Sequence, residues 1–182
     1  FYFYKTPKKK FKTKDLLQRE IPNLLSQIKW KKSMKWGDYD LFWGRPLKSI
    51  MTLYKEKPII FRFHHLKISN NTYIDKDFEL KKKSFKSFNA YINFFNSIDI
   101  IVDQKKRKDK IEKELYKISK KKNYLLKINL KLLEDVSNIV EKPKVIYCSF
   151  DKKFLDMPKE VIVTTIEKHQ KFFPIYDKNN NL

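Results

Sequence analysis

Glycine, alanine, cysteine and arginine are scarce in this sequence, and each shortage excludes a class of site. The 182 residues include two glycines and one cysteine. Two glycines are too few for a glycine-rich phosphate-binding loop. One cysteine excludes a disulfide framework and a zinc site built on several cysteines, and it suits a reducing cytoplasm. No apolar run approaches the ~18–20 residues of a membrane span, so we expect a cytoplasmic protein with no membrane partner.

Side chains that commonly carry catalysis are also sparse. His64 and His65 are adjacent, so on a strand they would face opposite sides and would not readily share a metal ion. His169 is far from them in sequence, and no H-E-x-x-H pattern occurs. We therefore expect no metal site and no catalytic residue. Cys148 stands inside an apolar run, which predicts a small buried hydrophobic residue.

Positive charge is abundant. The formal net charge is +21, from 42 Lys and Arg residues against 21 Asp and Glu. Such a surface attracts phosphate without reading sequence, which is typical of nucleic-acid binding. Nearly all of these cations are lysine, and AT-rich codon usage produces the same skew, so the alternative is a solvated surface without a partner. Arginine, the better bidentate partner of phosphate and guanine, occurs only at Arg19, Arg45, Arg62 and Arg107.

The hydrophobic pattern predicts an α+β fold, a mixed sheet with packed helices, with an irregular α/β layer as the alternative. The length suits a single domain over residues 1–182, in which residues 1–14 form a basic linker or a strand end. Five helices are predicted. The first is capped by Thr13 and is interrupted or kinked at Pro22. The others cover Ser84–Phe95, Gln104–Lys122, the segment from the cap Asn129 to Pro143, and a segment that begins at Pro158.

Strands are predicted where β-branched and aromatic residues cluster. They cover Pro58–Phe63, Asp99–Val102, Lys144–Phe150 and Phe172–Tyr176, with a turn at Asn70–Asn71. Two segments fit either type of element, namely Leu47–Tyr54 and Val161–Ile166.

Two predicted helices could contribute to nucleic-acid binding. Phe85, Phe88 and Phe95 belong to an aromatic stripe with helical spacing, which favours a buried core over base stacking. The Lys105–Lys108 cluster lies at the start of a helix, where positive charge opposes the helix dipole. That placement adds some support for a phosphate contact, but a solvated helix face is the favoured interpretation.

Two ordered blocks of the sequence resemble a known family. The first is WKKSMKWG at Trp30–Gly37, followed by Arg45-Pro46. The second is SFDKKFLDMP at Ser149–Pro158, followed by TTIEKHQKFFP at Thr164–Pro174. These blocks resemble the "WPKxMRWG", "VRP", "SFDxxFLxxP" and "TTMxxHQKYFP" elements of the β-subunit of the bacterial two-subunit glycyl-tRNA synthetase. They occur in the family's order and bracket most of the chain.

The sequence departs from the family's pattern at three places. The family's "TxGHRF" stretch is replaced by Thr72–Phe78, in which only the first and last residues match. Lys31 stands where the family has Pro, and Lys142 where it has Trp. A backbone turn that needs glycine must therefore differ here, and any role of the family's His or Arg in that stretch is lost.

The resemblance implies an internal fragment from the N-terminal half of a longer subunit, since the chain begins at Phe1 without Met. The family's enzyme joins glycine to tRNA(Gly) and uses ATP. Its adenylation site belongs to the separate α-subunit, so we expect no cofactor in this fragment. The implied fold is similar to the editing-type domain of the phenylalanyl-tRNA synthetase β-subunit. The implied function is tRNA handling or scaffolding, without catalysis by the fragment itself.

Two other functions stay open. One is a hydrolytic editing domain, in which His169 or Thr164 holds a water molecule. The other is a basic scaffold with no RNA contact.

The expected nucleic-acid contacts are chosen from the two family blocks. Arg45 is one of few arginines and precedes Pro46, whose ring fixes the local backbone. We rank these positions above the Lys105–Lys108 cluster. The alternative is that Arg45 pairs with a carboxylate and His169 caps a backbone group. The full expected set is Arg45, His169, Gln170, Lys171, Lys35 and Trp36.

Overall fold

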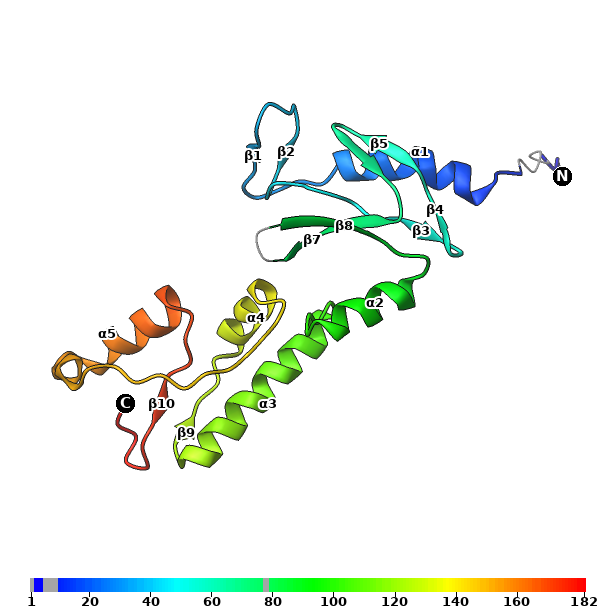
Figure 1. Ribbon diagram of the computed structural model, residues 1–182. Helices are drawn as coiled ribbons and strands as arrows, with labels where there is room; N and C mark the ends of the chain where they lie inside the picture. Colours follow the sequence, from blue (N-terminus) through cyan, green and yellow to red (C-terminus); the bar gives the residue numbers. More distant parts are fainter. Residues whose placement is uncertain (1, 5–9, 77–78) are drawn as a thin grey trace. The chain divides into compact units, whose positions relative to one another are not determined.

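The computed structural model describes residues 2–4, 10–76 and 79–182 (Figure 1). Internal contacts divide the chain into two compact units, Phe1–Tyr91 and Ile92–Leu182. Each unit combines α-helices with short antiparallel strand pairs, which confirms the α+β class. The expectation of a single domain stays a prediction.

The first unit begins with a helix and continues as a series of short strands. Its helix is α1 (Thr13–Ser26). The paired strands are β1 (Met34–Lys35) with β2 (Phe42–Trp43), β3 (Leu53–Tyr54) with β4 (Lys57–Pro58), β5 (Phe61–Phe63) with β6 (Leu66–Ile68), and β7 (Asn71–Lys76) with β8 (Glu79–Ser84). All four pairs are antiparallel, and a single parallel bridge joins Met51 to Ser69.

The core of the first unit lies between α1 and the β5–β6 pair. Phe61 and Phe63 alternate with exposed Arg62 along β5, so both rings face inward. They are buried with Leu41, Ile59 and Ile68, and the apolar stripe of α1 packs against this cluster. Each fully buried side chain of this size contributes about 1.5–3 kcal/mol, so this cluster fixes the framework on which the neighbouring loops stand.

Several sequence predictions for the first unit are wrong in detail. Thr13 is the first helical residue rather than the cap, and the cap position Lys12 makes no side-chain hydrogen bond. Helix α1 continues through Pro22. At the turn predicted over Asn70–Asn71, Asn70 lies in a bend and Asn71 begins β7; the Asn70 side-chain amide donates to the Phe85 carbonyl at 2.9 Å.

Two further expectations concern short extended segments. Tyr2–Tyr4 are not in a strand, and the rest of the predicted strand end and linker lies partly outside the described residues, at 1 and 5–9. The predicted strand over Pro58–Phe63 is present as the end of β4 and the whole of β5. Leu47–Tyr54 is irregular until it reaches the Met51 bridge and β3.

The second unit consists mainly of helices. The helix α2 (Phe88–Ser97) leads into it, followed by α3 (Gln104–Lys122), α4 (Leu130–Ile139), α5 (Lys159–Thr164) and the π-helical turn Thr165–His169. A 3-10 turn covers Lys152–Asp156, and β9 (Leu125–Leu126) pairs with β10 (Ile175–Tyr176). The core is Ile111 and Leu115 of α3 against Leu133 of α4.

The helix predictions for this unit are largely confirmed. Helix α3 has the predicted bounds, and Asp103 caps it by accepting a hydrogen bond from the Lys106 amide. Asn129 caps α4 as predicted, because its side chain accepts from the Lys131 and Leu132 amides. Pro158 occupies the position before α5, and the ambiguous segment at Val161 is helical.

The strand predictions for this unit are mostly wrong. Asp99–Val102 and Lys144–Phe150 have strand composition but no strand structure, and only Ile175–Tyr176 of the last predicted strand is paired. A strand requires a partner, and neither of the first two segments forms a ladder with any part of the chain that the structure describes. Cys148 is consequently exposed rather than buried.

The helix predicted over Ser84–Phe95 begins only at Phe88, so Phe85 precedes α2, and the predicted aromatic stripe is only partly core. Phe85 is buried at 4 % exposure, whereas Phe88 is 66 % exposed. Tyr91 and Phe95 are half-buried. The stripe therefore packs strongly at its beginning, where the Phe85 ring meets the Tyr91 ring edge-on at 5.2 Å between centroids.

Candidate nucleic-acid interface

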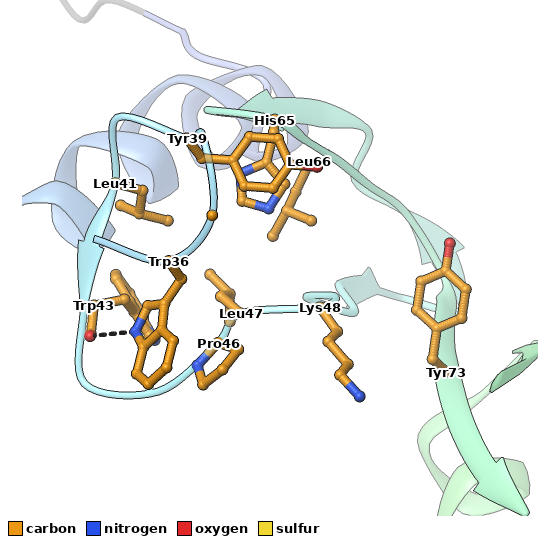
Figure 2. A pocket seen from close by; sticks show the side chains of 11 residues that line it. Trp36, Tyr39, Leu41, Trp43, Pro46, Leu47, Lys48, His65, Leu66 and Tyr73 are labelled. Carbon is orange, nitrogen blue, oxygen red and sulfur yellow. Dashed lines mark hydrogen bonds between the residues drawn. The ribbon is translucent and has the colours of Figure 1, made fainter. Parts of the chain in front are cut away.

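A pocket of about 550 Å³ opens in the first unit beside the β1–β2 pair (Figure 2). Its walls come from the β1–β2 connection, the segment after β2, the turn between β5 and β6, and strand β7. The lining residues are Trp36, Gly37, Tyr39, Leu41, Trp43, Pro46, Leu47, Lys48, His65, Leu66 and Tyr73. The volume falls in the range of small-ligand sites.

Aromatic rings dominate the pocket. The Tyr39 ring stacks on the His65 ring with 3.6 Å between centroids and 10° between planes. The Trp36 indole nitrogen donates to the Trp43 carbonyl at 2.9 Å, which fixes the orientation of the Trp36 ring (Figure 2). Tyr73 stands at the side of the opening and is 41 % exposed. The pocket thus offers several flat aromatic faces, and the Trp36 and Tyr39 rings are held in place by a backbone hydrogen bond and by ring stacking.

Both glycines of the chain lie in the loop that builds this pocket. Gly37 has φ +64°, a conformation that costs little only for glycine, and it follows Trp36 directly. A Cβ at Gly44 would lie 2.7 Å from Cε3 of Trp30, which packs against Trp43 at 4.8 Å between centroids. Glycine, which is scarce in this sequence, thus occurs at a turn and at a close contact with the Trp30 ring, where another residue would not fit.

The charge of the pocket is positive. Among its lining residues Lys48 carries the only charge of fixed sign, and no carboxylate is present. Nearby, Lys35 of β1 binds the Asp40 carboxylate at 2.7 Å, and this hydrogen bond lowers the pKa of Asp40. Asp38 and Asp40 both adjoin lining residues in sequence, but neither lines the pocket, so Lys48 is the charged side chain of the lining itself.

The structure brings some of the predicted contact residues to this pocket. Trp36 lines it directly. Arg45 is exposed and immediately precedes Pro46, which also lines the pocket. Lys35 precedes Trp36 but is engaged with Asp40. The three predicted residues of the first unit therefore cluster along one loop.

The other predicted contacts belong to the second unit. His169 and Gln170 are exposed at the end of the π-helical turn, and the Gln170 amide donates to the Thr165 carbonyl at 3.1 Å. Lys171 follows with φ +57°, and its ammonium binds the Asp135 carboxylate at 2.9 Å. This segment thus carries two exposed polar side chains and one cation already paired with α4.

The Lys105–Lys108 cluster serves the fold in part. The Arg107 guanidinium donates to three backbone carbonyls, those of Ile101 at 2.7 Å, Ser137 at 2.9 Å and Val102 at 3.0 Å. These bonds attach the start of α3 to the end of α4. The only arginine of the cluster is therefore engaged with the backbone, and the rank of this cluster as a phosphate contact stays a prediction.

Sequence reasoning missed most of the pocket. Tyr39 and His65 come from different loops, and Tyr73 from strand β7, for which no strand was predicted. The signal that was present is the density of aromatic residues between Trp30 and Trp43 around both glycines. The proximity of that loop to β7 arises from the fold, and no local sequence pattern indicates it.

Other kinds of site are not found in the part of the chain that the structure describes. No three His, Cys, Asp or Glu side chains gather there as a metal site would require. No helix among the described residues has the length and apolar character to span a bilayer.

Comparison with known proteins gives a consistent family. Residues 1–182 match the profile described as "Glycyl-tRNA synthetase beta subunit". Over the whole chain it is 33% identical to the "Glycine--tRNA ligase beta subunit" of Dictyoglomus thermophilum, covering 26% of that protein. It is 33% identical to the protein of the same name from Rickettsia prowazekii and 31% identical to that from Rickettsia akari, covering 27% of each. The chain thus spans about a quarter of the length of these relatives.

Proposed function

The chain belongs to the glycyl-tRNA synthetase beta subunit family, and on that premise we propose that it is a tRNA-handling part of a glycine–tRNA ligase. The match over the full 182 residues is the observation that carries this proposal. The ligase joins glycine to tRNA(Gly) at the expense of ATP. Adenylation is the work of the α-subunit, the partner of the subunit to which this chain belongs, and the assembly is cytoplasmic.

Physical features of the chain support tRNA handling over bare scaffolding. The net charge of +21 creates a field that attracts the phosphate backbone. The aromatic pocket and exposed Arg45 lie on one loop of the first unit, and His169 and Gln170 offer polar groups in the second. The fold similarity to the editing-type domain of the phenylalanyl-tRNA synthetase β-subunit stays a prediction. No contact of His169 or Thr164 favours hydrolytic editing.

The test measures tRNA(Gly) affinity of the complete ligase across salt concentrations. Arg45 and Lys171 are replaced together by alanine, and the slope of log K against log salt is expected to fall by about one unit for each lost phosphate contact. Arg62→Ala, which removes another exposed arginine of the first unit, is the matched control for Arg45→Ala and is expected to keep the slope.

Lys171 needs a control of its own because it is paired in the structure. Asp135→Asn breaks the same ion pair but retains the lysine. If Lys171→Ala lowers tRNA affinity and Asp135→Asn does not, the effect is due to the loss of the cation. A third variant replaces Lys105, Lys106 and Lys108 with Gln and leaves Arg107 in place. An unchanged slope for the Arg45 and Lys171 variant, together with a clear drop for the lysine variant, would reverse the ranking of the two surfaces.

A further inference from the structure

We propose that the aromatic pocket of the first unit receives one unstacked nucleobase from a single-stranded RNA segment, with Lys48 and Lys82 beside its phosphate. This inference deepens the proposed function and rests on it. It assigns the base to the rings of Trp36, Tyr39 and Tyr73, residues that no sequence pattern brought together.

The first step is the chemistry of the walls. Flat aromatic faces bind two common kinds of ligand, cations and other flat π-systems. A cation is disfavoured here, because Lys48 lines the pocket and no carboxylate does. The remaining ligand has a flat ring and a negative charge, and a nucleotide combines both.

The second step is the position of the positive charge. Figure 2 shows the Lys48 side chain extending between Trp36 and Tyr73. In the β7–β8 pair, Tyr73 lies directly opposite Lys82, so the two side chains share one face of the hairpin. A base held between the rings would therefore place its phosphate near two exposed ammonium groups.

The third step concerns the form of the RNA. Bases inside an A-form duplex are stacked on each other and do not offer their faces to protein rings. The pocket of about 550 Å³ has room for a single nucleotide rather than a stretch of helix. The site thus fits an end, loop or bulge of RNA, where a base can be turned outward.

The fourth step is preorganisation. Trp36 is oriented by its bond to the Trp43 carbonyl, and Tyr39 is held by its stack on His65. The Thr72 hydroxyl, next to Tyr73, hydrogen-bonds the Ser49 hydroxyl next to Lys48 at 2.9 Å. This bond links the strand that carries Tyr73 to the segment that carries Lys48, so both sides of the opening are fixed before a ligand arrives.

The test uses the complete ligase and three labelled probes: a single-stranded RNA hexanucleotide of mixed sequence, the same hexanucleotide with abasic sites, and an RNA duplex. Tyr73→Leu and Lys48→Met are each expected to weaken hexanucleotide binding about fivefold or more, the effect of losing one stacked base or one phosphate contact. Tyr73→Phe retains the ring and should bind as the unchanged protein does. The abasic probe should bind weakly and be insensitive to Tyr73→Leu.

Matched controls come from exposed residues that do not line the pocket. Tyr116→Leu on α3 and Lys67→Met on β6 remove the same side-chain types and should change hexanucleotide affinity by less than about twofold. Thermal unfolding of every variant shows whether the fold is retained. Tyr73→Phe keeps the test decisive if Tyr73→Leu unfolds the protein, because weaker hexanucleotide binding by the Phe variant would overturn the proposal.

The outcomes separate this inference from the proposed function. Equal hexanucleotide affinity in the unchanged protein and in the Tyr73→Leu and Lys48→Met variants would overturn the pocket assignment. If Arg45→Ala still lowered tRNA affinity in that case, the tRNA-handling role would stand. Displacement of the hexanucleotide by polyglutamate, with the same sensitivity to Lys48→Met, would identify an acidic peptide as the ligand and overturn the assignment to RNA.

Discussion

Arg107 shows how a single residue of a basic cluster can act on the fold rather than on a partner. Its guanidinium bonds three carbonyls, one of them that of the fully buried Ser137. A lysine ammonium at this position would not present the same planar fork of donors. Net charge counts arginine and lysine equally, but at this position only arginine has the geometry to form these three hydrogen bonds.

Replacing Arg107 by Lys is expected to lower the free energy of unfolding by about 1–3 kcal/mol, because carbonyls of the α3–α4 junction lose charged donors. Urea unfolding monitored by circular dichroism measures the change. Arg19→Lys is the control, since Arg19 forms a surface pair with the neighbouring Glu20, and its effect should stay within about 0.5 kcal/mol. Equal stabilities of the two variants would remove the structural role assigned to Arg107.

At the scale of elements, the β3–β4 turn is strained because it lacks glycine. Lys55 and Glu56 have φ values of 47° and 60°, the pattern of a type I′ turn that usually contains Asn-Gly. Left-handed backbone costs a side-chain-bearing residue roughly 1–2 kcal/mol. Because neither turn residue is glycine, the two-residue hairpin loop carries this backbone strain at Lys55 and Glu56.

Glu56→Gly is therefore expected to raise the free energy of unfolding by about 0.5–1 kcal/mol. This is the backbone strain that glycine relieves, reduced by the entropy cost of the more flexible unfolded chain. The measurement is the melting temperature, which should rise. Lys67→Gly, placed within strand β6, is the control and should lower it, because glycine in a strand interior destabilises. A lower melting temperature for both variants would contradict the turn geometry.

Helix α3 begins with a carboxylate cap that makes its first turn sensitive to acid. The Lys106 amide donates to Asp103, and this hydrogen bond lowers the pKa of Asp103. A carboxyl group with a lowered folded pKa stabilises the fold above its unfolded value of about 3.9 and loses that contribution as the pH falls through the folded pKa.

Asp103→Asn keeps a capping oxygen but no titrating group. The stability difference between the unchanged protein and this variant is expected to be constant from pH 7 to about pH 5 and to change in favour of the variant below about pH 4. Urea midpoints measured across this range follow the difference. Asp38→Asn, at a position that caps no helix, serves as the control, and a parallel pH trend in both variants would argue against the cap.

Elements defined by local chemistry were predictable from the sequence, and those defined by distant partners were not. The cap Asn129 and the seam of Ile111 and Leu115 identify α4 and α3 within a few residues of sequence. Lys144–Phe150 has the composition of a strand, but a ladder needs a second strand, and its exposed Cys148 shows that burial does not follow from composition alone. No pocket was predicted from the sequence; of its lining residues only Trp36 is among the predicted nucleic-acid contacts, and Arg45 precedes the lining residue Pro46.

At the scale of the whole molecule, several acidic residues form local ion pairs with lysines. Asp40, Asp99 and Asp135 each bind a lysine in the described part of the chain. These surface pairs are individually weak, but they leave the positive excess of the sequence distributed over lysines that face solvent. Under the proposed function, we therefore expect electrostatic attraction to RNA to come from the whole lysine-rich surface, and selectivity to come from the few fixed rings and arginines.

The 182-residue chain on its own is expected to show no glycine-dependent exchange of pyrophosphate into ATP, because its two glycines are too few for a glycine-rich phosphate-binding loop and the proposed function places adenylation in the α-subunit. The exchange assay is run on the purified chain and, as a positive control, on the complete ligase. Exchange by the purified chain, free of other subunits, would show that activation chemistry resides in this sequence.

The exposed thiol of Cys148 makes this chain convenient for spectroscopy. It is the only cysteine of the 182 residues and lies at the surface of the second unit. A maleimide dye would therefore attach at one known position, without the removal of other cysteines from this sequence. With a second cysteine introduced at exposed Lys67 of the first unit, a donor–acceptor pair would report the distance between the two units in solution and its change when tRNA binds.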